Sequence, residues 1–478
     1  MESQAATRPT RCSIQHTRKG SIKIIIRIRK IGLKDFKNVE NGTISLPCAQ
    51  KELDEDMESE IIGIYGQNGS GKTAVVEAMH MLRLILSGNP LPENSGDYIH
   101  QAAESAELSF EFDVQLHQET CAVYYQAQLE RCGSSSANIS KEKLSCRIYS
   151  VPVRGVSDDP EAPVSPQAAP AAAKKETIIE FDAKEKGYAF RPLKNLKRLN
   201  HKSPENNVDL LVSKKMSQKN RTSFIFSDDT YEILRNAYDF ADYRDIIFGL
   251  RHYAHSKLFI IQHGNGYQDS PLALREPSVV PAEVYESMKK AAEQINIVLS
   301  AIIPGLETDI KNYGSQLGAD GSRGIRIETV SRRQGLEIPM RYESDGIKKI
   351  ISILSSMIKM YNDPSVCLVV DELDSGIFEY LLGELLEILA ENARGQLIFT
   401  SHNLRPLEKL STDSLIFTTT NPKNRYYRFS GKNGRESLRG RYYRCISLGG
   451  QRENLYEQTD HFEISRAFRT AGRMTDES

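Results

Sequence analysis

The sequence lacks the cysteine spacing that a zinc site or a disulfide framework requires. Its seven cysteines include no Cys-x-x-Cys pair, and their number is odd. Disulfide frameworks and structural zinc sites use paired, regularly spaced cysteines. We therefore expect neither kind of site, and we expect a cytoplasmic protein in a reducing compartment.

The sequence also lacks a membrane span, a secretory segment and an excess of charge. No uninterrupted apolar run is long enough to cross a bilayer. The first residues, MESQAATRPTRCSIQHTRKGS, are polar and basic, without the apolar core of a signal peptide. We expect no membrane partner and a flexible extension at the start. Because 62 basic and 63 acidic residues give a net charge of -1, overall charge offers no argument for nucleic acid binding.

The stretch IIGIYGQNGSGKT, which begins at Ile61, has the spacing of a phosphate-binding P-loop. An apolar run typical of a buried strand ends in glycines, and a helical pattern, KTAVVEAMHMLRLIL, follows. The segment from Gly66 to Thr73 fits G-x-x-x-x-G-K-[ST]. Glycines let backbone N–H groups surround phosphates, and the helix adds its positive N-terminal end. The pattern predicts that Lys72 reaches the β- and γ-phosphates and that the Thr73 hydroxyl binds Mg²⁺.

A pair of carboxylates ends a second apolar strand, in VCLVVDELD. Asp371 there can hold the Mg²⁺ shell, and Glu372 can orient or deprotonate an attacking water. Acidic residues are also favoured at a solvated helix N-terminus, which explains Asp374 nearly as well as function does. It explains Asp371 poorly, because a buried strand directs this residue to the carboxyl edge of the sheet, where ligands bind.

Two further polar groups stand at the ends of regular elements. Ser344, in YESDGIKKI, precedes an amphipathic helix, where it can cap the helix or help to form an anion site; the sequence leaves both alternatives open.

 The triple Thr400, Ser401 and His402 ends the strand in LIFTSHN. A lone histidine at a strand end is most often structural or solvated, and a γ-phosphate contact is the functional alternative.

The rest of the chain predicts strands at both ends of the P-loop region and an α/β layer near the C-terminus. Residues 22–36 predict one or two strands, and AELSFEFDVQLHQETCAVYYQAQLERC predicts an antiparallel hairpin. The order strand, helix, strand, helix, strand after residue 320 predicts parallel pairing. We divide the chain into a flexible extension (1–20), an N-terminal ATPase half (21–130), a flexible linker and hairpin (131–190), a mainly helical insertion (191–305), a C-terminal ATPase half (306–425) and a tail element (426–478).

These pieces, in this order, resemble the heads of ABC-type ATPases. GQNGSGKT looks like Walker A, ESDGIKK is similar to a degenerate signature motif, VVDELDSG resembles Walker B with a D-loop, and TSHN looks like the switch histidine. The resemblance is to the soluble branch that includes RecF, the SMC family, the OLD nucleases and AAA-annotated ATPases of bacterial anti-phage systems. It implies an α/β fold, an ABC-type P-loop NTPase with a mixed or parallel sheet, an antiparallel β subdomain and a mainly helical insertion.

The resemblance also implies a role for each matching residue. Glu372 would be the general base, His402 would contact the γ-phosphate, and Asp371 and Thr73 would hold Mg²⁺. Asp374 would belong to the D-loop. The residues that would bind ATP are Gly66, Gln67, Asn68, Gly69, Ser70, Gly71, Lys72, Thr73 and Lys37, with Ser344 and Gly346 acting from a second subunit. The signature lacks its leading residues, and Gln101 and Gln218 are alternative candidates for the Q-loop.

Four functions compete on this basis. The first is an ATP hydrolase that works as a homodimer or higher oligomer and gates a protein effector on another chain, in anti-phage defence. The second is a RecF- or SMC-like repair or chromosome ATPase, with DNA bound by basic stretches such as RPLKNLKRLNHK. A non-catalytic nucleotide switch is disfavoured by Glu372, and a transporter subunit is disfavoured by the insertion and the incomplete signature.

Overall fold

The computed structural model describes residues 24–47, 57–116, 119–133, 135–149, 176–182, 221–236, 241–262, 271–318, 321–429, 437–448 and 453–475. The predicted flexible segment SDDPEAPVSPQAAPAAAKK and the Q-loop candidate Gln218 lie outside these residues. The strands are β1 (Ile25–Phe36), β2 (Val39–Ser45), β3 (Glu60–Tyr65), β4 (Ser105–Leu116), β5 (Glu119–Cys132), β6 (Ser136–Tyr149), β7 (Glu176–Asp182), β8 (Leu258–Ile261), β9 (Ser278–Val280), β10 (Glu307–Leu317), β11 (Arg323–Arg333), β12 (Leu336–Pro339), β13 (Cys367–Val370), β14 (Gln396–Thr400), β15 (Leu415–Thr418) and β16 (Tyr426–Tyr427). The α-helices are α1 (Lys72–Leu86), α3 (Asp228–Asn236), α4 (Ala241–Ser256), α5 (Ala282–Ile302), α6 (Asp345–Asn362), α7 (Glu379–Asn392), α8 (Pro406–Lys409), α9 (Leu438–Leu448) and α10 (His461–Thr475).

An antiparallel sheet in the order β2-β1-β4-β5-β6-β7 forms the first layer. The predicted hairpin is confirmed, because β4 and β5 pair antiparallel along their whole length. Strand β6 differs from the predicted linker. Its apolar alternation is interrupted by a register shift opposite Gln128 and Leu129 and by Glu142, which is buried. Glu142 accepts hydrogen bonds from the Tyr125 hydroxyl (2.7 Å) and the Ser223 hydroxyl (2.6 Å), so a charged residue occupies a core position.

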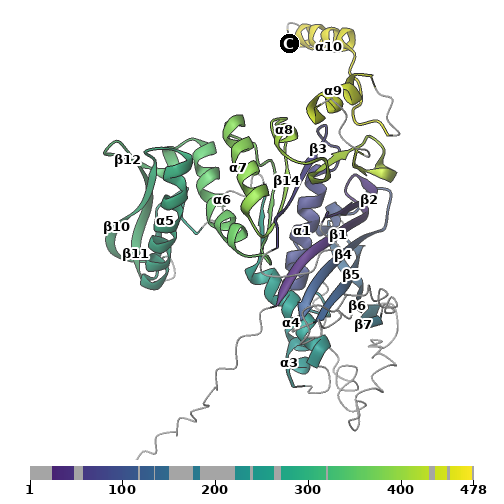
Figure 1. Ribbon diagram of the computed structural model, residues 1–478, viewed down its shortest axis with the longest axis horizontal. Helices are drawn as coiled ribbons and strands as arrows, with labels where there is room; N and C mark the ends of the chain where they lie inside the picture. Colours follow the sequence, from purple (N-terminus) through teal and green to yellow (C-terminus); the bar gives the residue numbers. More distant parts are fainter. Residues whose placement is uncertain are drawn as a thin grey trace, which may run out of the picture.

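A second sheet, in the order β16-β15-β3-β14-β13-β8, carries the P-loop strand at its centre. The parallel pairing predicted after residue 320 is confirmed for β13 and β14. It is wrong for the strand before α6, because β12 pairs antiparallel with β11 in a separate sheet. Strand β3 is parallel to β14, and only β16 runs antiparallel among the described strands of the central sheet. Alternate side chains of β3 enter two cores. Ile62 and Ile64 face the core shared with α1 and the antiparallel sheet, whereas Ile61 and Tyr65 face the core shared with α6 and α7. Figure 1 shows these layers on the two sides of the sheet.

The segment predicted as a helical insertion contributes to both of these layers. Helix α4 packs on α1, and β8 pairs in parallel with β13 at the edge of the central sheet. Helix α5 packs on α6 and on a small sheet of β9, β10, β11 and β12, which together form an arm beyond α6 (Figure 1). The domain boundaries stay a prediction.

The predicted fold class is confirmed: the protein is α/β, with a mixed, mainly parallel sheet and a separate antiparallel sheet. The amphipathic helix predicted after Ser344 is α6, and its apolar stripe faces the core of the central sheet. No helix in the described part of the chain combines the length and apolar character that a bilayer crossing needs.

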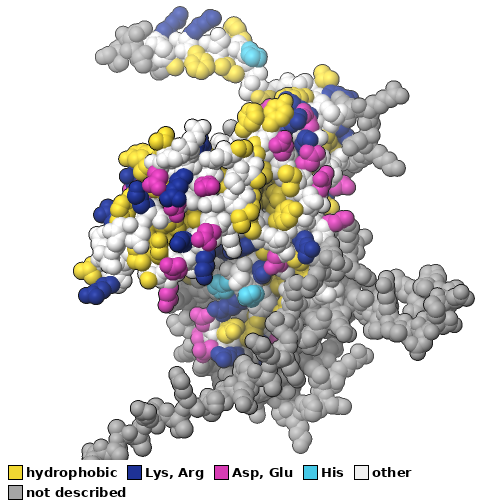
Figure 2. All heavy atoms as spheres, turned by 60° about the vertical axis from the view of Figure 1, so that its left-hand side comes forward, with side chains coloured by type: hydrophobic (Ala, Val, Ile, Leu, Met, Phe, Trp, Pro, Cys, Tyr) yellow, Lys and Arg dark blue, Asp and Glu magenta, His cyan; other side chains and the backbone are white. Residues whose placement is uncertain are grey.

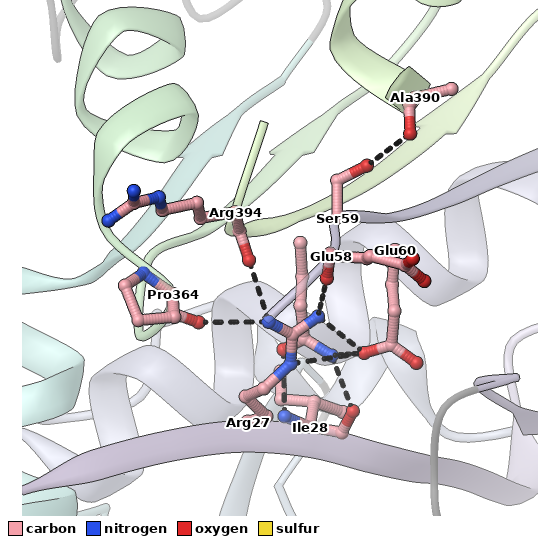
Figure 3. Close-up of polar contacts among 9 residues, drawn as sticks. Arg27, Ile28, Glu58, Ser59, Glu60, Pro364, Ala390 and Arg394 are labelled. Atoms are coloured by element: carbon pink, nitrogen blue, oxygen red, sulfur yellow. Dashed lines mark hydrogen bonds and ion pairs between the residues drawn. The ribbon is translucent and has the colours of Figure 1, made fainter. Parts of the chain in front are cut away.

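A buried charge network joins the two sheets (Figure 3). Arg27 of β1 forms an ion pair with Glu60 at the start of β3, at 2.9 Å. The same guanidinium donates to the carbonyl oxygens of Arg394 (2.7 Å) and Pro364 (3.3 Å), which lie in the loops that lead into β14 and β13. Gln396 adds a hydrogen bond to Glu60 at 2.7 Å. The planar guanidinium thus fixes the antiparallel sheet, β3 and two loops at one point.

We expect Glu60→Gln to lower the free energy of unfolding by about 3–5 kcal/mol, because it leaves the Arg27 charge buried without a counter-charge. Urea unfolding monitored by circular dichroism measures the change. Glu111→Gln is the matched control, since Glu111 of β4 pairs with Lys30, which lies on β1 as Arg27 does, at a partly exposed site. That control should cost less than about 1 kcal/mol. Equal losses in the two variants would contradict a special role for the buried pair.

Candidate nucleotide-binding site

The P-loop connects β3 to α1 and depends on its glycines at two points. A Cβ at position 66 would lie 1.7 Å from the Thr418 hydroxyl oxygen, so only glycine fits beside β15. Gly71 is the N-cap of α1 and has φ of 93°, a left-handed conformation that favours glycine. The first turn of α1 therefore opens toward the loop, with backbone N–H groups available for an anion.

Lys72 is held inside the loop that it follows. Its Nζ donates to the carbonyl oxygens of Gly66 (2.9 Å) and Gln67 (3.0 Å). Burial lowers the pKa of Lys72, and the nearby charges of Asp371 and Glu372 oppose that shift. A buried cation with neutral partners is well prepared for an anionic ligand, because hydrogen bonds between charged groups are stronger than those to neutral carbonyls.

The acidic pair lies directly after β13 and is organised by Thr400 of the neighbouring strand. The Thr400 hydroxyl donates to Asp371 Oδ1 at 2.6 Å and accepts from the Glu372 N–H at 2.7 Å. Glu372 has φ of 48°, a left-handed conformation that is uncommon outside glycine. Lys349 of α6 donates to the carbonyl oxygens of Asp371 and Glu372. A hydroxyl and an ammonium group therefore hold the turn that presents the two carboxylates.

These elements border one cavity of about 880 Å³. Its wall brings together residues of the P-loop, the acidic pair and the end of β14, which are far apart in the sequence. Nine predicted site residues line it: Lys37, Asn68, Gly69, Gly71, Lys72, Thr73, Asp371, Glu372 and His402. The Q-loop candidate Gln101 lines it as well, and so do residues without a predicted role: Asn38, Asp97, His100 and Thr400.

Three predicted P-loop residues support the loop from outside the cavity wall. Ser70 donates to the carbonyl oxygen of Gln67 at 2.5 Å and contacts the Thr418 hydroxyl at the same distance. Gly66 packs against Thr418, as described above. The Gln67 side chain accepts a hydrogen bond from the Glu457 N–H at 2.8 Å, near the end of the chain. Their contribution to a ligand is through the shape of the loop, and their predicted binding role stays a prediction.

Lys37 lies on the cavity wall in a left-handed turn between β1 and β2, with φ of 54°. Its Nζ pairs with Glu77 of α1, with N–O distances of 2.6 and 2.8 Å, and lies 5.4 Å from the centre of the Tyr98 ring. Burial raises the pKa of Glu77, and the ion pair with Lys37 opposes this shift. Lys37 thus links β1 to α1 at the edge of the cavity.

Ser344 and Gly346 do not line the cavity of their own chain. The Ser344 hydroxyl caps α6 by accepting from the Ile347 N–H at 3.3 Å, which confirms the capping interpretation. Gly346 contacts Gly376, because a Cβ at position 346 would lie 1.9 Å from the Gly376 carbonyl oxygen. The first turn of α6 therefore packs against the segment that follows the acidic pair. An action on a second subunit stays a prediction.

Asp374 organises the loop that carries His402. One carboxylate oxygen accepts from the backbone N–H groups of His402 (3.1 Å) and Asn403 (3.0 Å). The His402 side chain is exposed on the cavity wall. The carboxylate thus fixes the backbone at this strand end in the same chain, while a D-loop role for Asp374 stays a prediction.

Sequence patterns alone do not identify Lys349 or Asn38. Lys349 stands in a helix next to another lysine, and nothing in that spacing distinguishes the buried side chain from an exposed one. Asn38 belongs to a two-residue turn, where asparagine is common for conformational reasons. A place in the site is easier to predict for Thr400 than for these two residues, because a polar residue that ends a buried parallel strand lies at the same edge of the sheet as Asp371.

The donor set fits a magnesium ion of the kind that accompanies nucleotide phosphates. Among the described residues, no group of three or more His, Cys, Asp or Glu side chains forms a metal site. Asp371 and Thr73, the predicted metal ligands, both line the cavity. Mg²⁺ is usually held by one or two carboxylates together with substrate phosphates and water, so these two residues suit it only in combination with a phosphate ligand.

Two family models match the chain. A model described as an AAA domain matches residues 30–226, and a model described as an AAA domain, putative AbiEii toxin, Type IV TA system matches residues 192–407. A curated relative, the DNA replication and repair protein RecF of Pseudomonas entomophila (strain L48), is 34% identical over 80 residues. That match spans 17% of this chain and 17% of RecF.

Solved structures to which the chain is similar include SMC heads and RecF. The SMC head domain from Thermotoga maritima has a TM-score of 0.36 and 16% identity, covering 85% of this chain and 100% of that one. An Smc head from Pyrococcus furiosus, bound to the C-terminal domain of ScpA, has a TM-score of 0.36 and 11% identity, covering 85% and 97%. RecF in a structure with ATPrS has a TM-score of 0.34 and 10% identity, covering 79% and 93%.

The Thr400 hydroxyl can be tested through stability. We expect Thr400→Val, which keeps the shape of the side chain, to lower the free energy of unfolding by about 1–3 kcal/mol, since it removes two buried hydrogen bonds. Thr400→Ser is the control, because it keeps the hydroxyl and loses one methyl group. Urea unfolding of the two variants gives the comparison. A serine variant that is less stable than the valine variant would show that packing, and not the hydroxyl, holds the acidic turn.

Proposed function

We propose that the chain is an ATPase of the RecF/SMC/AAA class, which binds ATP with Mg²⁺ in the 880 Å³ cavity and hydrolyses it there; the matches to two AAA-domain models and to RecF support this class. One observation carries the proposal: Lys72, Thr73 and the Asp371–Glu372 pair face the same cavity from separate strands and helices. A phosphate-binding group opposite a carboxylate pair is the arrangement that phosphoryl transfer to water requires.

In the proposed reaction, each cavity residue has a separate task. Lys72 binds the phosphate oxygens, and the N-terminal turn of α1 supplies backbone N–H groups. Thr73 and Asp371 would hold Mg²⁺, which would supply positive charge to the phosphates. Glu372 orients a water molecule and takes its proton, and His402 lies on the wall where it can contact the γ-phosphate.

We propose further that two copies form a composite site, with Ser344 and Gly346 of one copy completing the cavity of the other. Support comes from the placement of α6. Its N-terminal turn is capped by Ser344 and lies outside the cavity of its own chain, next to Gly376. A helix N-terminus attracts anions, and a two-fold axis would bring it to the phosphates of a second copy.

The proposed biological role is to gate a protein effector on another chain, as the resemblance to anti-phage ATPases suggests. The second family model, with its printed description as a putative AbiEii toxin, supports this class of role. The RecF relative favours the alternative of a DNA-binding repair or chromosome ATPase. Titration with duplex DNA at several salt concentrations separates the two, since phosphate contacts make affinity fall steeply with salt.

The role of Glu372 as the base gives the first functional prediction. We expect Glu372→Gln to lower the single-turnover rate of ATP hydrolysis by about 10²–10⁴-fold and to leave ATP affinity within a few-fold, because a base acts on the chemical step. Rapid-quench measurements with radiolabelled ATP give the rate, and a fluorescent analogue gives the affinity. Glu379→Gln, at the exposed start of α7, is the control. A hydrolysis rate in Glu372→Gln close to the wild-type value would exclude Glu372 as the base.

The composite site gives the second functional prediction. Lys72→Ala and Ser344→Arg chains should each be inactive alone, because every site in either homodimer contains a damaged half. A mixture should regain hydrolysis, since the mixed dimer has one site with both halves intact. Steady-state ATPase assays on the separate and mixed proteins measure the recovery. Full activity of Ser344→Arg alone would show that the serine is a helix cap only.

A further inference from the structure

The C-terminal segment before α10 is attached to the P-loop. The Glu457 N–H donates to the Gln67 side chain at 2.8 Å, and the Asn454 carbonyl oxygen accepts from the Thr420 N–H at 2.8 Å. The buried side chain of Leu455 lies between these two contacts in the sequence. Helix α10 therefore begins a few residues from the rim of the proposed nucleotide site.

Helix α10 has an apolar face that nothing covers within the described part of the chain. Ile464, Ala467, Phe468 and Ala471 recur at helical spacing on this face, and Phe468 is 78% exposed. Three arginines lie on the opposite face. In Figures 1 and 2 the helix stands clear of the rest of the molecule, with hydrophobic side chains gathered on one side and basic side chains on the other.

An apolar groove of about 420 Å³ lies between α5, α6 and α7. Ile388 of α7 is half-exposed in it, and Tyr361 of α6 is partly exposed. Helix α7 carries four glutamates and no lysine or arginine, whereas α10 carries three arginines and one glutamate. The helices also match in length, since α7 has 14 residues and α10 has 15. An amphipathic helix that anchors side chains at positions i, i+4 and i+7 suits such a groove.

We propose that α10 of one copy docks in the groove between α5, α6 and α7 of a second copy, so that the two chains exchange C-terminal helices. The inference rests on the proposed composite site, because that site brings the N-terminus of α6 to the P-loop of the other copy. Helix α10 leaves from the rim of that P-loop, beside Gln67. It therefore starts next to the second copy's α6.

The distances suit this exchange. Leu354 is the first residue of α6 that lines the groove. It lies nine positions after Asp345, the first residue of the helix, so the groove begins about 14 Å from the N-terminus of α6. Helix α10 is about 22 Å long, so it reaches past this point and along the groove. The apolar face of α10 enters the groove, and its arginines remain at the surface, where they are attracted to the acidic surface of α7 at longer range.

The first experiment uses the full chain with Glu372→Gln and Mg-ATP, in which dimers should accumulate. Analytical ultracentrifugation measures the dimer dissociation constant. Phe468→Asp should raise it by about tenfold or more, as for the loss of a buried aromatic anchor. The matched control is Phe462→Asp, because Phe462 is 72% exposed on the arginine side of the same helix. On the groove side, Ile388→Asp should weaken the dimer, and Ile297→Asp, at an exposed α5 position outside the groove, should not.

A photocrosslinker at position 468 shows which chain holds the helix. A chain that carries benzoylphenylalanine at this position is mixed with a larger, tagged chain that does not. Crosslinks to α6 and α7 of the tagged chain are expected, mapped by mass spectrometry. Crosslinks within one chain, or equal effects of Phe468→Asp and Phe462→Asp, would overturn the proposal while leaving the composite site intact. A Glu372→Gln protein that binds ATP and stays monomeric would instead refute the composite dimer itself.

Discussion

The Thr400 hydroxyl is the contact on which the geometry of the candidate site depends. It lies on β14, between the P-loop strand β3 and the strand β13 that carries the acidic pair. By donating to the Asp371 carboxylate and accepting from the Glu372 N–H, it positions that carboxylate and the Glu372 backbone relative to the strand beside the P-loop. Because parallel strands end at one edge of the sheet, this single hydroxyl couples the register of three strands to the positions of the charged groups.

The first turn of α6 is coupled to the same acidic pair by two contacts. Gly346 packs against the Gly376 backbone so closely that no side chain fits between them. One turn further along α6, Lys349 donates to the carbonyl oxygens of Asp371 and Glu372. Burial lowers the pKa of Lys349, and the neighbouring carboxylates oppose the shift. A shift of α6 would therefore move the backbone of Glu372, so the proposed contact between α6 and a second copy would act on the proposed base through a short physical path.

The sequence predicted those features that local patterns determine. The P-loop, the acidic pair and the parallel strands follow from short stretches whose apolar runs and glycines allow few alternatives. Strand β6 escaped prediction because a register shift and the buried Glu142 break its alternation. Strand β8 has only four residues and follows directly after a helix, so the sequence gives too short a pattern to predict it. Its pairing with β13 at the edge of the central sheet is known only from the tertiary structure. The cavity wall formed by Asn38, Asp97 and His100 likewise depends on contacts between distant segments.

Gln67 connects the phosphate site to the end of the chain. Its carbonyl oxygen accepts hydrogen bonds from Lys72 Nζ and Ser70, and its side chain accepts from the Glu457 N–H. A phosphate oxygen is a stronger partner for the Lys72 ammonium group than a neutral carbonyl is. Nucleotide binding at Lys72 would therefore compete for one of the contacts that hold the Gln67 backbone. Since the same residue anchors the segment before α10, the phosphate site and this segment meet at Gln67, and a rearrangement of its backbone on nucleotide binding would reach the C-terminal helix directly.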